Sequence, residues 1–424
     1  MKKQILLLVL MLLPLMASAD DGGTCGDNGN NLTWTFVEET KTLTISGSGS
    51  MKNFSYDAPA WRNYRGSIQK VIIEDGVTSL GWYAFMNCYA LTTVVGGKDL
   101  TSIGNYAFYD CSKLTSFTIG PKVHELGDYM FYRTKITSIS IPASVDCIGE
   151  KCFDNCASLD TVYIENLAKW CKILFIRSSN PLSKAKHAFV DGQEITDFVI
   201  PNNATGISSD SFNGFQGISS VNTGDGVTYI GDGAFRSTSL STIVLGKNVT
   251  SIGCNAFTYC NELRDVYVYA ESVPYASPDD DDDHEGSFQR TDLSLATLHV
   301  PATLLEAYKT TAPWSQFGSI VEIVPEKCTT PTITYANGQV HFACETEDVE
   351  FVPTVTCTPS QLQNGNVLDI GGTFTVSVYA TKDGYVNSDI ATKIITINKL
   401  GDIDGDGQLT VTDVTSLVNA ILGK

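Results

Sequence analysis

The chain has 424 residues, of which 43% are hydrophobic and 18% charged, and its formal net charge at pH 7 is −19. A chain of this length usually folds into two or three domains. Nucleic acids and anionic lipids are bound through clustered lysine and arginine, so the acidic balance argues against both partners.

The first nineteen residues have the pattern of a secretory signal peptide. Lys2 and Lys3 precede the apolar run ILLLVLMLLPLM, and Ala17-Ser18-Ala19 is a small-residue cleavage site. The run is too short to span a bilayer, and no second apolar run of spanning length follows it. We therefore expect cleavage near Ala19 and a secreted or surface-displayed protein with no transmembrane segment in the mature chain.

A unit of 22 or 23 residues then repeats, apart from one break, along the first two thirds of the chain. Its fixed aromatic position is occupied by Phe85, Phe108, Phe131, Phe153, Phe212, Phe235 and Phe257. One such unit cannot bury its apolar residues alone, but stacked units share a continuous core. The fold class that we predict is a β-rich repeat solenoid of the leucine-rich-repeat type, with these rings stacked inside it. Its repeats should cover residues 68–270, interrupted at about 165–194, between caps at 20–67 and 271–326.

Each unit begins with a short strand, as in LTSFTIG, where Leu114, Phe117 and Ile119 should point inward. A turn, a second short strand ending in Ile-Gly or Leu-Gly, and a tight turn carrying the Phe complete the unit. The repeated glycine indicates either a positive φ or a close approach between neighbouring coils. The glycines at this position are Gly81, Gly104, Gly127, Gly149, Gly231 and Gly253.

Four of the twelve cysteines share one position of the repeat: Cys88, Cys111, Cys156 and Cys260. Thr134 and Thr238 replace cysteine there in other units, which favours a buried site for small residues. A disulfide between Cys88 and Cys111 is the alternative, because neighbouring coils lie roughly 5 Å apart.

The repeat resembles the BspA-like leucine-rich repeat family of bacterial surface and secreted proteins, which has the same Ile-Gly, Ala-Phe and Cys-x-x-Leu elements. The resemblance covers roughly residues 23–325, including a cap hairpin at the start, the interruption, and a closing cap with a last strand and a short helix. Ser208 departs from the pattern in place of the glycine, and Arg236-Ser237-Thr238 shortens one turn. The resemblance implies adhesion and binding to host matrix.

The strand register places the third and fifth residues of each repeat strand on the outside. Exposed faces of solenoid sheets commonly bind ligands, although threonine, serine and valine also simply suit strands. Thr297 and His299 occupy these positions in the last strand. The residues that we take as candidates for a ligand face are Ser116, Thr118, Ser138, Ser140, Thr161, Tyr163, Asn222, Thr242, Asp265 and Tyr267.

No catalytic motif is present. The five histidines are widely spread, and there is no H-E-x-x-H, G-x-S-x-G, phosphate loop or dinucleotide fingerprint. Carboxylates are abundant enough for a glycosidase pair, but a repetitive core without a loop-lined cleft is a poor place for one, so we expect no enzyme. The run PDDDDDHEG is not a calcium loop, because His284 and Arg290 stand where glycine and an acid are required. We expect a solvated loop there.

Residues 327–399 read as alternating strands, with a hairpin turn at Asn337-Gly338. They predict a small β-sandwich that resembles immunoglobulin-like or fibronectin type III-like modules, used as a spacer. Cys328, Cys344 and Cys357 are an odd set, so at most one disulfide forms among them.

The tail, residues 400–424, contains D-x-D-x-D-G and an acid at position twelve, which is the spacing of a Ca²⁺ loop. An amphipathic helix follows it. This loop-helix resembles a dockerin type I repeat, of which a full dockerin has two, and implies a cohesin-like partner. The expected Ca²⁺ ligands are Asp402, Asp404, Asp406, Gln408, Thr410 and Asp413.

From these patterns we expect a non-enzymatic, adhesin-like protein that binds a host protein, a cell surface or a glycan through its solenoid. The alternative is an accessory component of an extracellular polysaccharide-degrading system, attached through the dockerin-like tail. A structural role in a surface layer is a third hypothesis.

Overall fold

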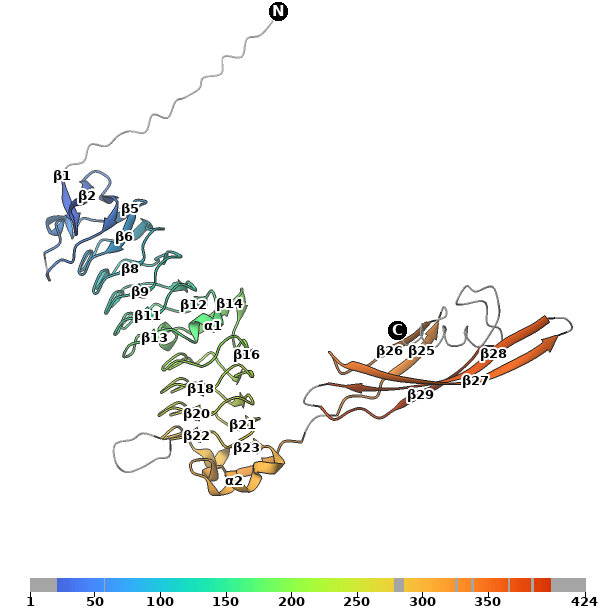
Figure 1. The fold of residues 1–424 in the computed structure, drawn as a ribbon. Coiled ribbons are helices and arrows are strands. Elements are labelled where there is room, and N and C mark those ends of the chain that lie inside the picture. Colours follow the sequence, from blue (N-terminus) through green and yellow to red (C-terminus); the bar gives the residue numbers. More distant parts are fainter. Residues whose placement is uncertain are drawn as a thin grey trace, which may run out of the picture. The chain divides into compact units, whose positions relative to one another are not determined.

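The computed structural model describes residues 21–56, 58–277, 286–324, 327–336, 339–364, 367–382 and 385–397 (Figure 1). The signal peptide, the aspartate run, the Asn337-Gly338 turn and the predicted calcium loop lie outside these residues. The chain divides into two compact units, one up to Ile323 and one from Val324.

The first unit begins with an antiparallel hairpin where the sequence predicts a cap. Strand β1 (Asp21–Gly26) pairs with β2 (Gly29–Val37), which pairs with β3 (Thr42–Gly47). β3 then pairs in parallel with the first repeat strand, so the hairpin covers the end of the stack. Trp61, which lies between β4 (Gly49–Ser50) and η1 (Arg62–Tyr64), is fully buried under the first repeat ring, Phe85.

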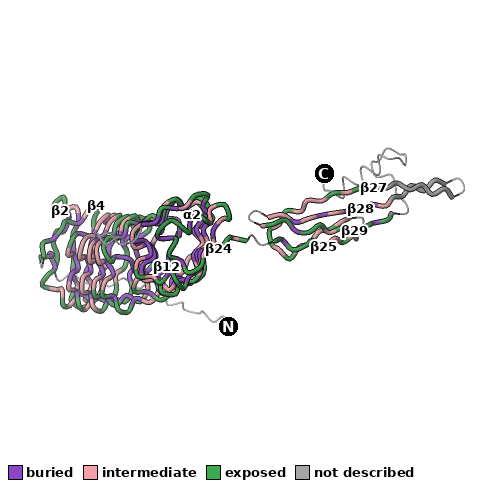
Figure 2. Tube along the Cα trace, turned by 90° about the horizontal axis from the view of Figure 1, so that it is seen from below, coloured by how far each residue is buried: buried purple, intermediate pink, exposed green. Residues whose placement is uncertain are grey.

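Most coils of the solenoid contribute one strand to each of two ladders of parallel strands (Figure 1). Buried residues line the inside of the coils and exposed residues the outside (Figure 2). The first ladder contains β5 (Lys70–Ile73), β7 (Thr93–Gly96), β10 (Ser138–Ile141), β12 (Thr161–Ile164), β14 (His187–Val190), β16 (Asp197–Val199), β17 (Ser220–Asn222), β19 (Thr242–Leu245), β21 (Asp265–Val268), β23 (Thr297–Val300) and β24 (Ser319–Glu322). The second contains β6 (Val77–Leu80), β8 (Ser102–Ile103), β9 (Glu125–Leu126), β11 (Cys147–Ile148), β13 (Leu174–Phe175), β18 (Tyr229–Ile230), β20 (Ser251–Ile252) and β22 (Tyr275–Ala276).

The first ladder is divided into three sheets. They are β1-β2-β3-β5-β7, β10-β12-β14-β15 and β16-β17-β19-β21-β23-β24. No strand forms over residues 114–120. β7 ends at Gly96, whose φ of 93° is incompatible with an extended strand, and the Phe117 ring of the next coil packs against the Phe108 and Phe131 rings.

The predicted interruption at 165–194 is in fact another coil of the stack. β13 pairs with β11, and β14 pairs with β12, both in parallel. The coil is lengthened by the short helices α1 (Leu167–Trp170) and η2 (Pro181–Ser183), each of which has an asparagine side chain as its N-cap. The strand β15 (Gln193–Glu194) then folds back antiparallel to β14 and ends this sheet.

The predicted phenylalanine ladder is confirmed. Consecutive ring centroids from Phe85 to Phe153 lie 5.3, 5.9 and 5.4 Å apart, and those from Phe212 to Phe257 lie 5.2 and 5.5 Å apart. Trp61 extends the first row and Phe288 the second. The two rows share one continuous hydrophobic core.

Between the two rows, side chains of the lengthened coil bond to the next turn of the solenoid. The Nδ2 of Asn180 donates to the carbonyl oxygens of Asp210 and Ser211 at 2.6 and 2.8 Å. The indole nitrogen of Trp170 donates to the Ser211 carbonyl as well, at 2.9 Å. Both side chains are buried, so these bonds join the two repeat blocks in the absence of a stacked phenylalanine.

Close approach, and not positive φ, explains the repeated glycine. A Cβ on Gly81 would lie 1.9 Å from the Lys52 carbonyl oxygen, and one on Gly149 would lie 2.7 Å from the Gly127 carbonyl carbon. Positive φ occurs two residues later, at Tyr83, Tyr106, Tyr129, Lys151, Asp210, Gly233 and Asn255.

The cysteines of the repeat are free thiols, as the favoured interpretation predicts. The carbonyl of Phe131 accepts from Thr134 Oγ1 of its own coil at 2.8 Å and from Cys156 Sγ of the next coil at 3.0 Å. In the second block, Thr238 and Cys260 bond the Phe235 carbonyl in the same way. Threonine and cysteine alternate here because each is small and carries a donor.

The first unit closes with η3 (Leu293–Leu295), η4 (Ala302–Leu304), α2 (Leu305–Thr310) and η5 (Trp314–Gln316) around β23 and β24. Tyr308 of α2 and Trp314 of η5 are fully buried. The Trp314 indole donates to the Pro274 carbonyl at 3.0 Å. A strand and a short helix therefore cover this end of the core, as expected.

The second unit is all-β in the residues described. β25 (Thr332–Ala336) pairs with β26 (Gln339–Ala343), and β28 (Val367–Thr381) pairs with both β27 (Glu350–Asn364) and β29 (Ala391–Ile397), all antiparallel. Phe374, Val376 and Ile395 form a small core with residues of β25 and β26. A typical immunoglobulin domain has at least seven strands, so that assignment stays a prediction.

Candidate functional site

We define the outer face of the first ladder as the third and fifth residues of the repeat pattern L-x-x-L-x-L, which are Ser138 and Ser140 in the repeat that contains β10. This face has the predicted register. Burial alternates along β10, β12, β19 and β21, and all ten candidates are exposed or half-buried. Strand geometry explains this, because successive side chains point to opposite faces and the inward ones enter the core.

The structure divides the candidates into three groups. Ser138, Ser140, Thr161 and Tyr163 lie together on the four-stranded sheet, where Ser138 is level with Thr161 and Ser140 with Tyr163. Ser116 and Thr118 are exposed but lie outside any strand. The remaining four, on the six-stranded sheet, are Asn222, Thr242, Asp265 and Tyr267.

The first group has an aromatic centre. The Tyr163 ring, 46% exposed, stacks on the ring of Phe189 with centroids 5.5 Å apart. Beside them His187 Nδ1 lies 2.5 Å from Glu194 Oε1. Sequence reasoning missed Phe189 and His187 because they fall within the supposed interruption, although HAFV has the alternation of a repeat strand.

The second group centres on an imidazole. The rings of Tyr267 and His299 are nearly parallel, 10° apart, with centroids at 4.1 Å, and His299 Nε2 lies 3.0 Å from Asp265 Oδ1. Partial burial raises the pKa of Tyr267 above its ordinary value. Asp265 orients the imidazole, so the three side chains offer a ligand a flat ring surface, a hydroxyl and a carboxylate. His299 was on the predicted outer face but not among the candidates.

A pocket of about 430 Å³ lies where the four-stranded and six-stranded sheets meet. It is lined by polar groups of Glu165 and Asn166 and by apolar groups that include Val190, Phe198 and Val199. It exists because β15 folds back and leaves the ladder open at this point. Among the described residues no group of three or more His, Cys, Asp or Glu side chains could hold a metal ion.

Comparison with known proteins identifies the repeats. The family model of the BspA type leucine rich repeat region matches residues 60–180 and 184–277 with six copies, which is just over half of the chain. The chain belongs to this family. None of the curated proteins matches it.

Solved structures of leucine-rich repeat proteins are also similar. One, from Eubacterium ventriosum ATCC 27560, is 20% identical and covers 75% of this chain and 92% of its own, with a TM-score of 0.39. Another, from Bacteroides ovatus ATCC 8483, is 18% identical and covers 69% and 75%, with a TM-score of 0.41. A leucine rich cell surface protein from Faecalibacterium prausnitzii A2-165 is 19% identical and covers 72% and 96%, with a TM-score of 0.31. The family assignment rests on the repeat match alone.

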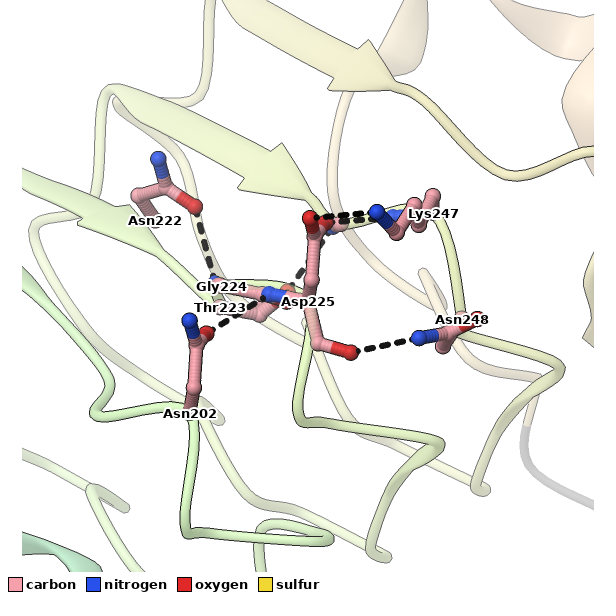
Figure 3. A network of polar contacts seen from close by, with 8 residues as sticks. Asn202, Asn222, Thr223, Gly224, Asp225, Lys247 and Asn248 are labelled. Atoms are coloured by element: carbon pink, nitrogen blue, oxygen red, sulfur yellow. Dashed lines mark hydrogen bonds and ion pairs between the residues drawn. The ribbon is translucent and has the colours of Figure 1, made fainter.

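A polar network joins the turns at the ends of the strands in the second BspA-type block. Asp225 Oδ1 accepts from the backbone nitrogen of Lys247 at 3.1 Å, and its Oδ2 pairs with the Lys247 ammonium at 3.2 Å. These contacts, the backbone hydrogen bond first, hold the pKa of Asp225 below its usual range. Since every partner belongs to the same solenoid, the network stabilises the stack. Figure 3 shows its residues Asn202, Asn222, Thr223, Gly224, Asp225, Lys247 and Asn248.

None of the helices in the described parts of the chain is long and apolar enough to cross a membrane.

Proposed function

We propose that this BspA-type protein is a secreted or cell-surface, non-enzymatic binding protein whose solenoid recognises an extracellular protein or glycan. The observation that carries the proposal is the pair of ring clusters on the outer face, Tyr163 with Phe189 and Tyr267 with His299. Partly exposed aromatic side chains on a rigid sheet provide large contact areas at little loss of side-chain entropy. The signal-peptide pattern supports export.

A binding screen tests the proposal. The chain from Asp20 onward is applied to arrays of extracellular matrix proteins and of glycans, and each ligand found is titrated against Tyr163→Ser and Tyr267→Ser. Removing a central aromatic contact from an interface typically weakens binding tenfold or more. The matched control is Thr297→Ser, which changes a half-buried side chain on the same outer face without removing a ring.

The proposal holds if at least one of the two tyrosine variants binds at least tenfold more weakly while Thr297→Ser binds like the parent. Empty arrays, or ligands whose affinity neither variant changes, would refute binding through the outer face.

A second function, that of an accessory component of a polysaccharide-degrading system, is favoured only by the tail. There we propose a Ca²⁺ ion held by Asp402, Asp404, Asp406, Gln408, Thr410 and Asp413, and a cohesin-like partner for the helix that follows. Carboxylates alternating with a glycine at the sixth position suit Ca²⁺ because the loop can surround the ion with oxygen ligands.

Isothermal titration with CaCl₂ tests the tail. One binding event should be lost in the Asp402→Ala/Asp406→Ala double variant and kept in Asp389→Ala, an exposed aspartate outside the loop. Absence of Ca²⁺ binding in the parent chain removes the metal site, and failure of the calcium-loaded chain to bind any cohesin removes the accessory function.

A further inference from the structure

Tyrosines occupy costly backbone positions in the first repeat block. Tyr83, Tyr106 and Tyr129 have φ of 59°, 59° and 53°, in the left-handed region that bulky residues rarely adopt. The same position in the second block has Gly233 and Asn255, for which this conformation is less costly. Backbone outliers of this kind concentrate at ligand-binding sites. The turns that contain these three tyrosines are therefore candidates for such a site.

The tyrosines form two neighbouring rows of rings. Tyr83, Tyr106 and Tyr129 are stacked with centroids 5.0 Å apart at each step. Tyr109 and Tyr132, stacked at 4.9 Å, form the second row. In the coil before Tyr109 the equivalent residue is the buried Met86, so among the described residues no ring is stacked on that side of Tyr109.

A pocket of about 420 Å³ lies where the second row begins. This volume is within the range of small-ligand sites. Tyr89 is 48% exposed and has no ring stacked on it among the described residues. The lining of the tyrosine pocket, as we name it, includes Tyr83, Asn87, Tyr89, Tyr106, Tyr109 and Asp110.

Two polar groups of the pocket are not used by the fold. In the part of the chain that the structure describes, neither the side-chain amide of Asn87 nor the carboxylate of Asp110 has a hydrogen-bond partner, although both residues are half-buried. Arg133, also at the pocket, lies over the Tyr132 ring at 5.4 Å and has no carboxylate partner there. The pocket thus offers an acceptor, an amide and a donor beside aromatic rings.

We propose that the tyrosine pocket binds a neutral oligosaccharide. A pyranose ring has one face of C–H groups that packs on an aromatic ring, and an edge of hydroxyls, each of which both donates and accepts. Planar amide, carboxylate and guanidinium groups bond such hydroxyls in pairs. Tyr109 and Tyr89 supply the aromatic contact, and Asp110, Asn87 and Arg133 supply the hydrogen bonds.

The chemistry of the pocket disfavours charged ligands. Aromatic cages that bind quaternary ammonium rely on the attraction of a cation to the rings, but the Arg133 guanidinium would repel a cation here. Acidic glycans are disfavoured by Asp110 and by the net charge of −19. A neutral sugar needs no compensating charge. The pocket lies on the turns between strands and does not depend on the outer face proposed above.

The test uses the chain from Asp20 onward and isothermal titration with cellohexaose, xylohexaose, maltohexaose and chitohexaose. At least one should bind, and Tyr89→Ala and Asp110→Asn should each weaken it at least tenfold. Asn is suitable at position 110 because it tolerates the φ of 54° there. The controls are Tyr275→Ala, which removes another exposed tyrosine, and Asn155→Gly, which changes the position equivalent to Asp110 two coils away.

Each variant is first checked for folding by circular dichroism, and only variants whose thermal midpoint lies within 2 °C of that of the parent are compared. Failure of all four oligosaccharides to bind overturns the proposal, as does equal weakening by the controls. Heparin, choline or a proline-rich peptide binding through Tyr89 and Asp110 in their place also overturns it. Tyr267→Ser on the outer face should leave oligosaccharide binding unchanged, so either proposal can fail without the other.

Discussion

The two repeat blocks have the same interior and different turns. Each has a phenylalanine row, a glycine pressed against the preceding coil, and a phenylalanine carbonyl that accepts from a threonine and a cysteine. At the left-handed position, however, the first block has three tyrosines and Lys151, and the second has Asp210, Gly233 and Asn255. Stacking therefore determines the inside of each coil, while the turn residues are free to differ.

If the interiors are equivalent, removing one ring should be equally harmful in either block. Phe108 and Phe235 are both fully buried between stacked rings. We expect Phe108→Ala and Phe235→Ala each to lower the free energy of unfolding by about 3–5 kcal/mol, because a buried cavity remains. Urea denaturation followed by circular dichroism measures both. A difference above about 2 kcal/mol would show that the two interiors are not equivalent.

The junction between the blocks should be sensitive to one side chain. Asn180→Ala removes the two hydrogen bonds that the side chain donates to Asp210 and Ser211, and also the N-cap bond that it accepts from the Leu182 backbone nitrogen. Carbonyl oxygens and a buried backbone N–H are left with fewer partners. We expect a loss of about 1–3 kcal/mol and a broader or divided denaturation transition, since repeat units are coupled only to their neighbours.

Asn213→Ala is the matched control for this junction, because among the described residues the Asn213 side chain donates only to the Asp210 carboxylate, within its own turn. If Asn180→Ala changes stability no more than this control does, the blocks are joined by the continuous hydrophobic core alone.

Buried thiols should make both blocks sensitive to alkali. Burial raises the pKa of Cys156 and of Cys260 from 9.0 to about 11. In the unfolded chain these thiols ionise near pH 9, whereas in the folded chain they remain protonated until about pH 11. Their contribution is thus fully present below pH 9 and is lost as the pH rises from 9 to 11, by roughly 1–3 kcal/mol for each thiol.

Urea midpoints at pH 8, 9, 10 and 11 measure this loss. In Cys156→Ala/Cys260→Ala the decline between pH 9 and 11 should be smaller than in the parent, whereas Cys344→Ala, which removes a thiol of the second unit, should leave the decline of the solenoid unchanged. Equal slopes in all three proteins would show that thiol ionisation does not control alkaline stability.

What the sequence predicts well is what recurs with the coil. The Phe rows, the Cys and Thr positions and the outward register all follow from residues that must meet their equivalents 22 or 23 positions away. The division of the first ladder between Gly96 and Phe117, and the lengthened coil that contains Phe189, could not be predicted from the repeat. They depend on local φ and on strands whose spacing departs from the period.

The tyrosine pocket had a signal that was overlooked. A tyrosine recurs two residues after the glycine at positions 83, 106 and 129, and again at 109 and 132. The left-handed backbone of Tyr83, Tyr106 and Tyr129 and the tyrosine pocket beside Met86 could not be derived from this spacing, because tyrosine is not a residue that indicates positive φ.

The smallest effect should come from the polar network at the strand ends of the second block. Hydrogen bonding, first from the Lys247 backbone nitrogen, lowers the pKa of Asp225. Its contribution is present above the pKa of an unfolded aspartate, near 4, and is lost as the pH falls through the lower folded value. Because the group is close to solvent, we expect less than about 1 kcal/mol. Asp225→Asn should therefore reduce the decline in the urea midpoint between pH 5 and 3 only slightly. A larger effect of Asp225→Asn than of Asn180→Ala would mean that the turns, and not the interior, dominate the stability of the second block.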